Sequence, residues 1–281
     1  MKIKYLVLFL LSFHLIKAQE NSLLWEISGN GLSQPSYLYG TIHLICPNDY
    51  FLTDSTRWAV ERSEQIYLEL DMDDPTLLLK IPQMMMLQNG LKIKDLLSPN
   101  DYQILDDYFQ RKGMNINMME STKPFALMSL MYMTLLNCPP QSYEANFMQM
   151  ATQAKKEILG LETVEFQMGV FDSIPYAKQA AMLVEMARES QKSVNEFELM
   201  VQAYKNQDLA QLYKMLQESP SNFEGYEDVL LARRNQAWIP VMYKAMQSKP
   251  TFFAVGAGHL EGQKGVIALL RKEGFRVRAM R

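Results

Sequence analysis

Histidine and cysteine are scarce in this chain, whose 281 residues include three histidines and two cysteines. His14 lies in an apolar N-terminal segment, so His43 and His259 are the two histidines available to the rest of the chain. The sequence also contains no Gly-x-Ser-x-Gly motif and no His-Glu-x-x-His motif. These absences argue against a serine hydrolase with a nucleophile elbow and against a zincin-type metalloprotease.

Positive charge is not concentrated in any part of the sequence. Charged residues make up 21% of the chain, the formal net charge is −3, and no basic stripe is present. We therefore expect no nucleic-acid partner. The glycines that begin at Gly256 do not form a dinucleotide fingerprint either, because position 261, where Gly-x-Gly-x-x-Gly requires glycine, is Glu261.

Long apolar runs are absent after the first residues of the chain. Two lysines precede the apolar run at residues 5–13, and a short polar stretch follows it. This pattern is typical of a secretory signal peptide with cleavage near Ala18, and the run is too short to span a bilayer well. We expect residues 1–19 to be the signal peptide and residues 20–281 to form a single domain. The mature chain is then periplasmic or extracellular and has no transmembrane segment.

The two cysteines, Cys46 and Cys138, leave three alternatives open. In an exported protein an even number of cysteines permits one disulfide. Two buried free thiols are the second alternative. Cys46 as a metal ligand is the third, because it lies shortly after His43.

The hydrophobic pattern changes from strands, through a long helical section, back to strands. Expected strands are 23–28 and 36–39, joined by a Gly-Asn-Gly turn, then 65–71, 157–161, 251–255 and 275–280. Expected helices are 54–63, 98–111, 123–137, 142–156, 173–189 and 262–272, with two or three more before residue 247 and prolines at 220 and 240 as punctuation. The fold class is therefore α/β (α+β), with a central mixed sheet formed by the N- and C-terminal strands.

The two remaining histidines share one local frame. His43 ends Gly40-Thr41-Ile42-His43, His259 ends Gly256-Ala257-Gly258-His259, and each motif follows a short apolar strand. Ligands of open α/β sheets bind beyond the carboxyl ends of the strands, and glycine permits a tight turn and a close approach there. We expect the two imidazoles to meet in one crevice, although each histidine by itself is commonly a hydrogen-bonded structural residue.

Carboxylates must complete any metal site, because a divalent ion usually has at least three protein ligands. Glu69, at the end of a hydrophobic strand, is the first candidate, and Glu162, after a second short strand, is the other. The mixed nitrogen and oxygen ligands suit Zn, Mn or Co. Arg234 precedes Trp238 in a helix and could polarise a carbonyl group. Structural salt bridges are the alternative for each of these three charged residues.

Several segments together resemble the TraB/PrgY/GumN family, which includes the TIKI metalloproteases. The matching segments are Leu24-Trp25-Glu26-Ile27, Tyr37-Leu38-Tyr39-Gly40-Thr41-Ile42-His43-Leu44, Leu68-Glu69-Leu70-Asp71, Gly160-Leu161-Glu162-Thr163 with Gln167, Arg234-Asn235, and Val255-Gly256-Ala257-Gly258-His259-Leu260 with Gly262 and Gly265. They follow the family's order along nearly all of the mature chain.

The resemblance implies a divalent-metal-dependent peptidase that acts on a peptide or protein substrate. Carried onto this sequence, it places metal ligands at His43, His259 and Glu69, with Glu162 and Arg234 as supporting catalytic groups. The residues alone leave two other functions open: a non-catalytic protein that sequesters an exported peptide or other ligand on its methionine-rich helices, and a hydrolase of a non-peptide bond such as an ester.

Overall fold

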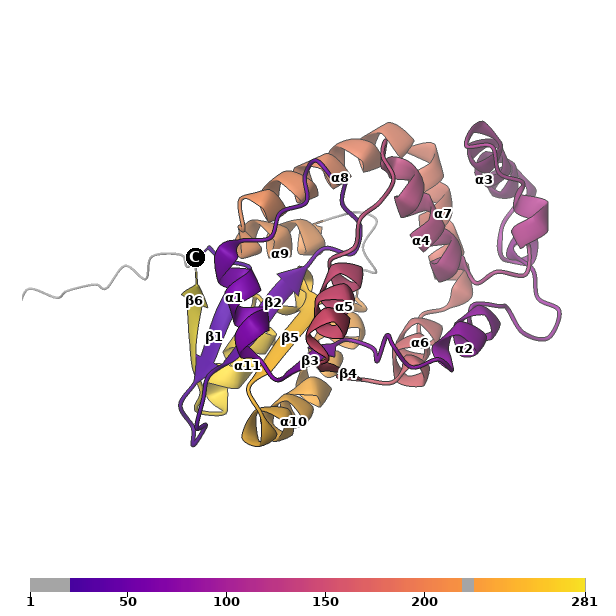
Figure 1. Ribbon diagram of the computed structural model, residues 1–281. Helices are drawn as coiled ribbons and strands as arrows, with labels where there is room; N and C mark the ends of the chain where they lie inside the picture. Colours follow the sequence, from indigo (N-terminus) through magenta and orange to yellow (C-terminus); the bar gives the residue numbers. More distant parts are fainter. Residues whose placement is uncertain (1–20, 219–224, 281) are drawn as a thin grey trace, which may run out of the picture.

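The computed structural model describes residues 21–218 and 225–280, so the expected signal peptide lies outside the described residues. Within this part of the chain, six strands form one mixed sheet in the order β4-β3-β5-β2-β1-β6 (Figure 1). The strands are β1 (Leu24–Ser28), β2 (Ser36–Thr41), β3 (Gln65–Leu68), β4 (Glu157–Gly160), β5 (Thr251–Gly256) and β6 (Arg276–Met280). The predicted α/β class, with a central sheet built from both ends of the chain, is confirmed.

The sheet has a parallel half and an antiparallel half. Strands β4, β3, β5 and β2 run parallel to one another, whereas β1 is antiparallel to both β2 and β6. The predicted hairpin joins β1 to β2, and its turn residues Gly29, Asn30 and Gly31 all have positive φ. Because the four parallel strands point the same way, their carboxyl ends lie at one edge of the sheet.

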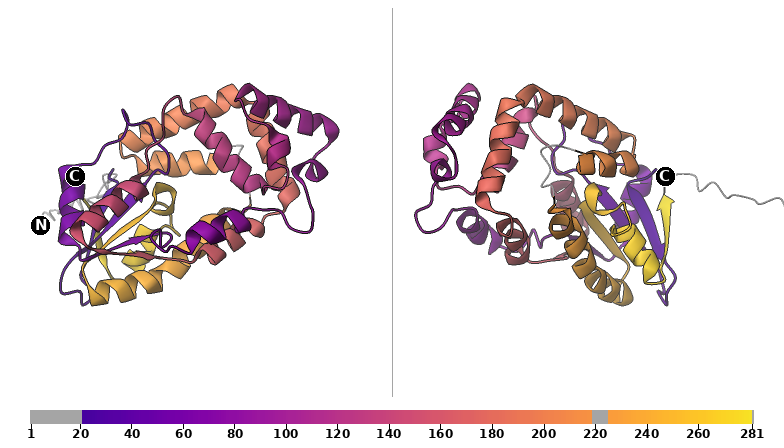
Figure 2. Two further views of the ribbon diagram at one scale, coloured as in Figure 1. Left: turned by 45° about the vertical axis from the view of Figure 1, so that its right-hand side comes forward. Right: turned by 180° about the vertical axis from the view of Figure 1, so that it is seen from behind.

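Helices cover the sheet and extend away from it (Figure 2). In the described residues, the helices next to the strands are α1 (Asp54–Arg62), α5 (Tyr143–Ala154), α8 (Ser190–Lys205), α9 (Leu209–Glu218), α10 (Arg233–Ser248) and α11 (Val266–Lys272). The others are α2 (Leu77–Met84), α3 (Pro99–Arg111), α4 (Pro124–Leu135), α6 (Val164–Asp172) and α7 (Tyr176–Arg188). None of these helices is long and apolar enough to cross a membrane.

The apolar residues form a main core at the sheet and a separate core in the projecting helices. The main core includes Tyr39, Phe252 and Trp238, which are almost fully buried. The second core lies among α3, α4 and α7 and contains several methionines, such as Met128 and Met182. Methionine fills irregular gaps in such cores, which accounts for part of the chain's high methionine content.

Several expected boundaries differ from the structure. Strand β3 ends at Leu68 and not at residue 71, because its partner β4 ends opposite it at Gly160. Helix α11 begins at Val266 and not at residue 262, since Gly262 has a φ of +90°. Pro240 lies inside α10 and does not interrupt it. Its side chain is exposed, as is Gln236 one turn earlier, so water can bond the carbonyl that loses its intrahelical partner.

The sequence pattern also missed α2 and α6. These two short helices pack against each other beyond the carboxyl edge of β3 and β4. Helix α6 begins at the N-cap residue Thr163, whose side chain accepts a hydrogen bond from the Phe166 N–H. It thereby brings Gln167 into the candidate site described below.

Candidate metal and catalytic centre

Four neighbouring parallel strands each lead directly into one residue of the candidate site. Glu69 is the first residue after β3, Glu162 follows β4 by two residues, His43 follows β2, and His259 ends the short 3₁₀ helix η4 (Ala257–His259) after β5. Backbone hydrogen bonds extend the alignment of β3 with β4, because the Glu162 N–H donates to the Glu69 carbonyl at 3.0 Å. The structure thus brings the two Gly-x-x-His motifs together at one strand edge.

The side chains of the site converge beside the α-carbon of Gly256. A β-carbon added to Gly256 would lie 3.4 Å from Glu69 Oε1, 3.6 Å from His259 Cδ2 and 3.7 Å from His43 Nε2. The three side chains therefore surround one small space that a larger residue would fill. At the other motif, a β-carbon on Gly40 would lie 3.1 Å from the α-carbon of Ala257, so both glycines permit close approach.

Glu69 is a buried carboxylate with partners on both oxygens. Oε1 accepts the Gly256 N–H at 2.9 Å, and Oε2 accepts from Arg234 Nη2 at 2.6 Å and from Gln167 Nε2 at 3.1 Å. Burial raises the pKa of Glu69, but the charges of His259, Arg234 and His43 and the Gly256 amide lower it to about 2. When His259 is neutral, Arg234 and the amide still favour the ionised carboxylate.

Arg234 joins the two acidic residues of the site. Its side chain is buried, and its Nε and Nη2 donate to Glu162 at 3.0 and 2.6 Å. Glu162 is 3% exposed and also accepts from Trp238 Nε1 at 2.9 Å and from Gln167 Nε2 at 3.0 Å. Both Glu162 oxygens are therefore engaged in holding Arg234, so a role for Glu162 as the base that accepts a proton from water has no support in this geometry.

His259 is buried, and its hydrogen bonds fix its tautomer. Its Nε2 lies 3.0 Å from Arg234 Nη1, which can only donate, so Nε2 accepts. Its Nδ1 lies 2.6 Å from Asn235 Oδ1, and the Asn235 amide nitrogen donates to the carbonyls of His259 and Lys264. The proton therefore resides on Nδ1. Burial, together with the charge of Arg234 and against the pull of Glu69, lowers the pKa of His259 to about 3.

His43 has a different environment from His259. Its Nδ1 lies 2.9 Å from Glu144 Oε1, and its side chain is 67% exposed. Desolvation lowers the pKa of His43, but the hydrogen bond and the charge of Glu144 outweigh desolvation and raise the pKa overall. Because the ring is exposed, water screens the attraction between His43 and Glu144. The two histidines of the same motif thus have a carboxylate partner in one case and an amide partner in the other.

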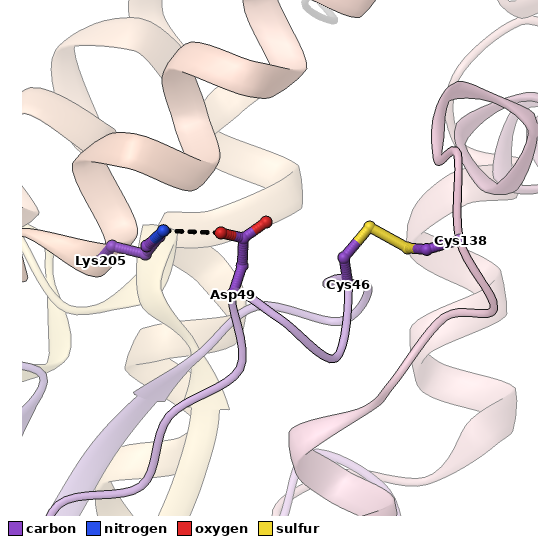
Figure 3. Close-up of a disulfide and its surroundings, with 4 residues drawn as sticks. All are labelled: Cys46, Asp49, Cys138 and Lys205. Atoms are coloured by element: carbon purple, nitrogen blue, oxygen red, sulfur yellow. Dashed lines mark hydrogen bonds and ion pairs between the residues drawn. A yellow bond between two sulfur atoms is a disulfide. The ribbon is translucent and has the colours of Figure 1, made fainter.

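Some residues of the centre could not be recognised from the sequence. In the sequence, Glu144 looks like an ordinary acidic residue in the first turn of a helix that begins after Ser142. Gln167 and Asn235 appeared only among the residues that match the family. Cys46, which was one candidate ligand, is bonded to Cys138 in a disulfide and is excluded as a ligand (Figure 3).

The donor chemistry of the centre fits a divalent cation. His43 Nε2, His259 Nε2 and the Glu69 carboxylate are ligand types of hydrolytic metal sites, and each imidazole Nδ1 is held by an oxygen acceptor as in metal-ligating histidines. As arranged, no three or more His, Cys, Asp or Glu side chains within residues 21–218 and 225–280 have metal-site spacing. In this arrangement Arg234 Nη1 donates to the lone pair of His259 Nε2, so this hydrogen bond must break before His259 could bind an ion through Nε2.

A cavity of about 480 Å³ borders the same region. Its lining includes Gly258 and Asn235, beside His259, together with apolar atoms of Leu216 and Leu231 from the neighbouring helices. The cavity is therefore within reach of a molecule that also contacts His259.

This chain is similar to several proteins that are named metalloproteases. "Metalloprotease TIKI1" of Danio rerio is 24% identical over 92% of this chain, and "Metalloprotease TIKI1" of Homo sapiens is 23% identical over 93%. "Metalloprotease TIKI2" of Danio rerio is 24% identical over 92%. This chain covers 63%, 62% and 60% of those three relatives, respectively, so it spans less than two thirds of their length.

No solved structure matches this chain. The family model described as TraB/PrgY/gumN matches residues 23–279, which include all four parallel strands and every residue of the centre. The chain therefore belongs to the TraB/PrgY/gumN family.

Proposed function

We propose that this protein is an exported, divalent-metal-dependent hydrolase that cleaves a peptide or protein substrate. The observation that carries the proposal is the arrangement of His43 Nε2, the His259 ring and Glu69 Oε1 around the α-carbon of Gly256. Imidazole and carboxylate groups that converge on one point at a strand edge are the groups that activate water in metal-dependent hydrolases. The names of the TIKI relatives support peptides as the substrate class.

His43, His259 and Glu69 are the residues that would hold the ion, and Mn, Co and Zn all suit these ligands. When bound, the ion supplies Lewis acidity and lowers the pKa of water towards neutrality. Glu69 is ionised and lies beside His43, so it would supply the negatively charged ligand of this set.

Arg234 would not bind the ion but would stabilise negative charge on the substrate. Glu162 holds the planar guanidinium through Nε and Nη2, so Nη1 keeps its position, and its N–H that now points to His259 would be the donor to a substrate oxygen. A guanidinium that donates to a developing oxyanion stabilises negative charge in the transition state. The cavity beside Asn235 and Gly258 offers a place for an apolar side chain of the substrate.

Export is part of the proposal and has support outside the centre. The N-terminal pattern is that of a signal peptide, and the Cys46–Cys138 disulfide is typical of oxidising compartments. Fractionation of cells that express the full chain tests this point. We expect the protein outside the cytoplasm with the segment before residue 20 removed, and an uncleaved cytoplasmic protein would contradict it.

The activity is tested with the purified protein, a peptide library, and Mn²⁺, Co²⁺ or Zn²⁺ added separately. We expect bound metal by elemental analysis, and cleavage that a chelator stops. His43→Ala and His259→Ala should abolish both while the circular dichroism spectrum stays unchanged. Unaltered metal content in both variants would contradict the proposal, and retention of intact peptides without metal would favour a sequestering protein instead.

A further inference from the structure

Glu144 contacts His43 from α5, a helix that lies about a hundred residues further along the chain. It lies in the first turn of α5, and its Oε1 is 2.9 Å from His43 Nδ1. The same oxygen accepts from Thr41 Oγ1 at 2.7 Å, and Oε2 accepts from Ser142 Oγ at 2.7 Å. Thr41 belongs to the Gly-x-x-His motif itself, so this motif supplies both the histidine and a hydrogen bond that holds Glu144.

The carboxylate of Glu144 is held in place by its surroundings. Its side chain is only 17% exposed, and the hydroxyl groups of Thr41 and Ser142 donate to its two oxygens. Its place at a helix N-terminus also favours a negative charge. Glu144 therefore presents His43 with a fixed acceptor of negative charge.

His43 needs such a partner more than His259 does. The His259 ring is buried and packs against Trp238 with centroids 4.5 Å apart, so its neighbours hold it in place. The His43 side chain is 67% exposed, and packing does not determine the orientation of its ring. Hydrogen bonding of Nδ1–H to a carboxylate fixes both the ring and the nitrogen that carries the proton.

We infer that Glu144 is the positioning residue of the centre, which holds His43 as the Nδ1–H form with Nε2 directed towards Gly256 and Glu69. This inference rests on the proposed function, because it assigns Nε2 of His43 to the metal. Outer partners of metal-ligating histidines typically affect metal affinity or activity by about 10–100-fold, and we expect an effect of that size here.

The test compares Glu144→Ala and Glu144→Gln with matched controls, Glu165→Ala and Glu165→Gln. Glu165 is also an acidic residue in the first turn of a helix, but it pairs with Lys80 at the surface. Mn²⁺ affinity is measured by competition with a chelating dye. We expect Glu144→Ala to weaken it about 10–100-fold, Glu144→Gln to recover part of it through its amide oxygen, and both controls to match the parent.

A second measurement needs neither metal nor activity. In protein with ¹⁵N-labelled histidine, the hydrogen-bonded Nδ1–H of His43 should give a slowly exchanging downfield proton signal, assigned by its loss in His43→Gln. The signal should disappear in Glu144→Ala and persist in Glu165→Ala. Persistence in Glu144→Ala, with Mn²⁺ affinity within about twofold of the control, would overturn the inference.

The two measurements separate the two proposals. A parent protein that neither binds Mn²⁺ nor cleaves peptides contradicts the proposed function, and the proton signal alone then decides whether Glu144 positions His43. Should Glu144→Ala fail to fold, Glu144→Gln carries the affinity test. An affinity equal to that of Glu165→Gln would then count against the inference.

Discussion

Among single residues, two glycines are as important for the centre as its charged groups, because each leaves space that a side chain would fill. Gly256 leaves the space in which His43, Glu69 and His259 converge, and its φ of −51° is accessible to any residue. Gly160 has a different function, because a β-carbon there would lie 2.7 Å from the backbone nitrogen of Asp71. Gly256 therefore leaves space among the side chains of the centre, whereas Gly160 allows two backbone segments to lie close together.

Alanine substitution should separate these two functions. Gly256→Ala adds a methyl group at ordinary contact distances of 3.4–3.7 Å, so the fold should survive while metal affinity and peptide cleavage fall at least about tenfold. Gly160→Ala forces the backbone apart and should destabilise the protein by roughly 1–3 kcal/mol. Urea unfolding and metal titration of both variants check this. Equal effects of the two substitutions on stability would contradict the distinction.

At the scale of elements, a disulfide and a backbone bridge connect the His43 loop to the segment before α5. Cys46 is bonded to Cys138, with α-carbons 5.7 Å apart (Figure 3). Next to it, Ile45 exchanges two backbone hydrogen bonds with Gln141. Asp49 of the same loop pairs with Lys205 of α8 at 2.6 Å. The loop that carries His43 and the helix that carries Glu144 are therefore held together covalently.

Removing the disulfide should affect both stability and the centre. The bond joins residues separated by 92 positions, and loss of a native disulfide that closes a long loop typically costs about 2–5 kcal/mol. We expect Cys46→Ser/Cys138→Ser to lower the melting temperature and to weaken Mn²⁺ binding. Dithiothreitol should have the same effect on the parent and none on the double variant. A parent insensitive to the reductant in both measurements would contradict this expectation.

At the scale of the whole molecule, the sheet places buried ionisable groups where folding and protonation are linked. The pKa of His259 is about 3 in the folded protein against an ordinary value of 6.5, and that of Glu69 is about 2 against 4.5. Both pKa values are depressed by folding. The stability that each group contributes is therefore present above its ordinary pKa and is lost as pH falls towards its folded value.

The metal-free protein should therefore be sensitive to acid. We expect the free energy of unfolding to fall as pH decreases from 6.5 towards 3, because the unfolded chain binds protons at His259 and then at Glu69 before the folded protein does. Urea midpoints measured with a chelator at pH 7.5, 5.5 and 4.5 check this. His259→Gln should show a smaller decrease, and identical midpoints at all three pH values would contradict the linkage.

Local sequence patterns were enough to predict the class of fold and the main members of the centre. Alternating and apolar runs predicted the strands, and glycine turns before His43 and His259 placed both histidines at strand ends. Glu69 and Glu162 were recognised because each lies at the end of a short hydrophobic strand. Such patterns are local, because burial of one face of a strand leaves its mark within a few residues of the chain.

The contacts between these groups depend on the three-dimensional arrangement of the chain and could not be predicted from local patterns. The partnership of Glu144 with His43, the hold of Glu162 on Arg234 and the neutral state of His259 all join residues from different elements. Each depends on the order β4-β3-β5-β2, which lines up strand ends that lie far apart in sequence. No local pattern encodes that order, because it results from how the whole chain buries its apolar surface.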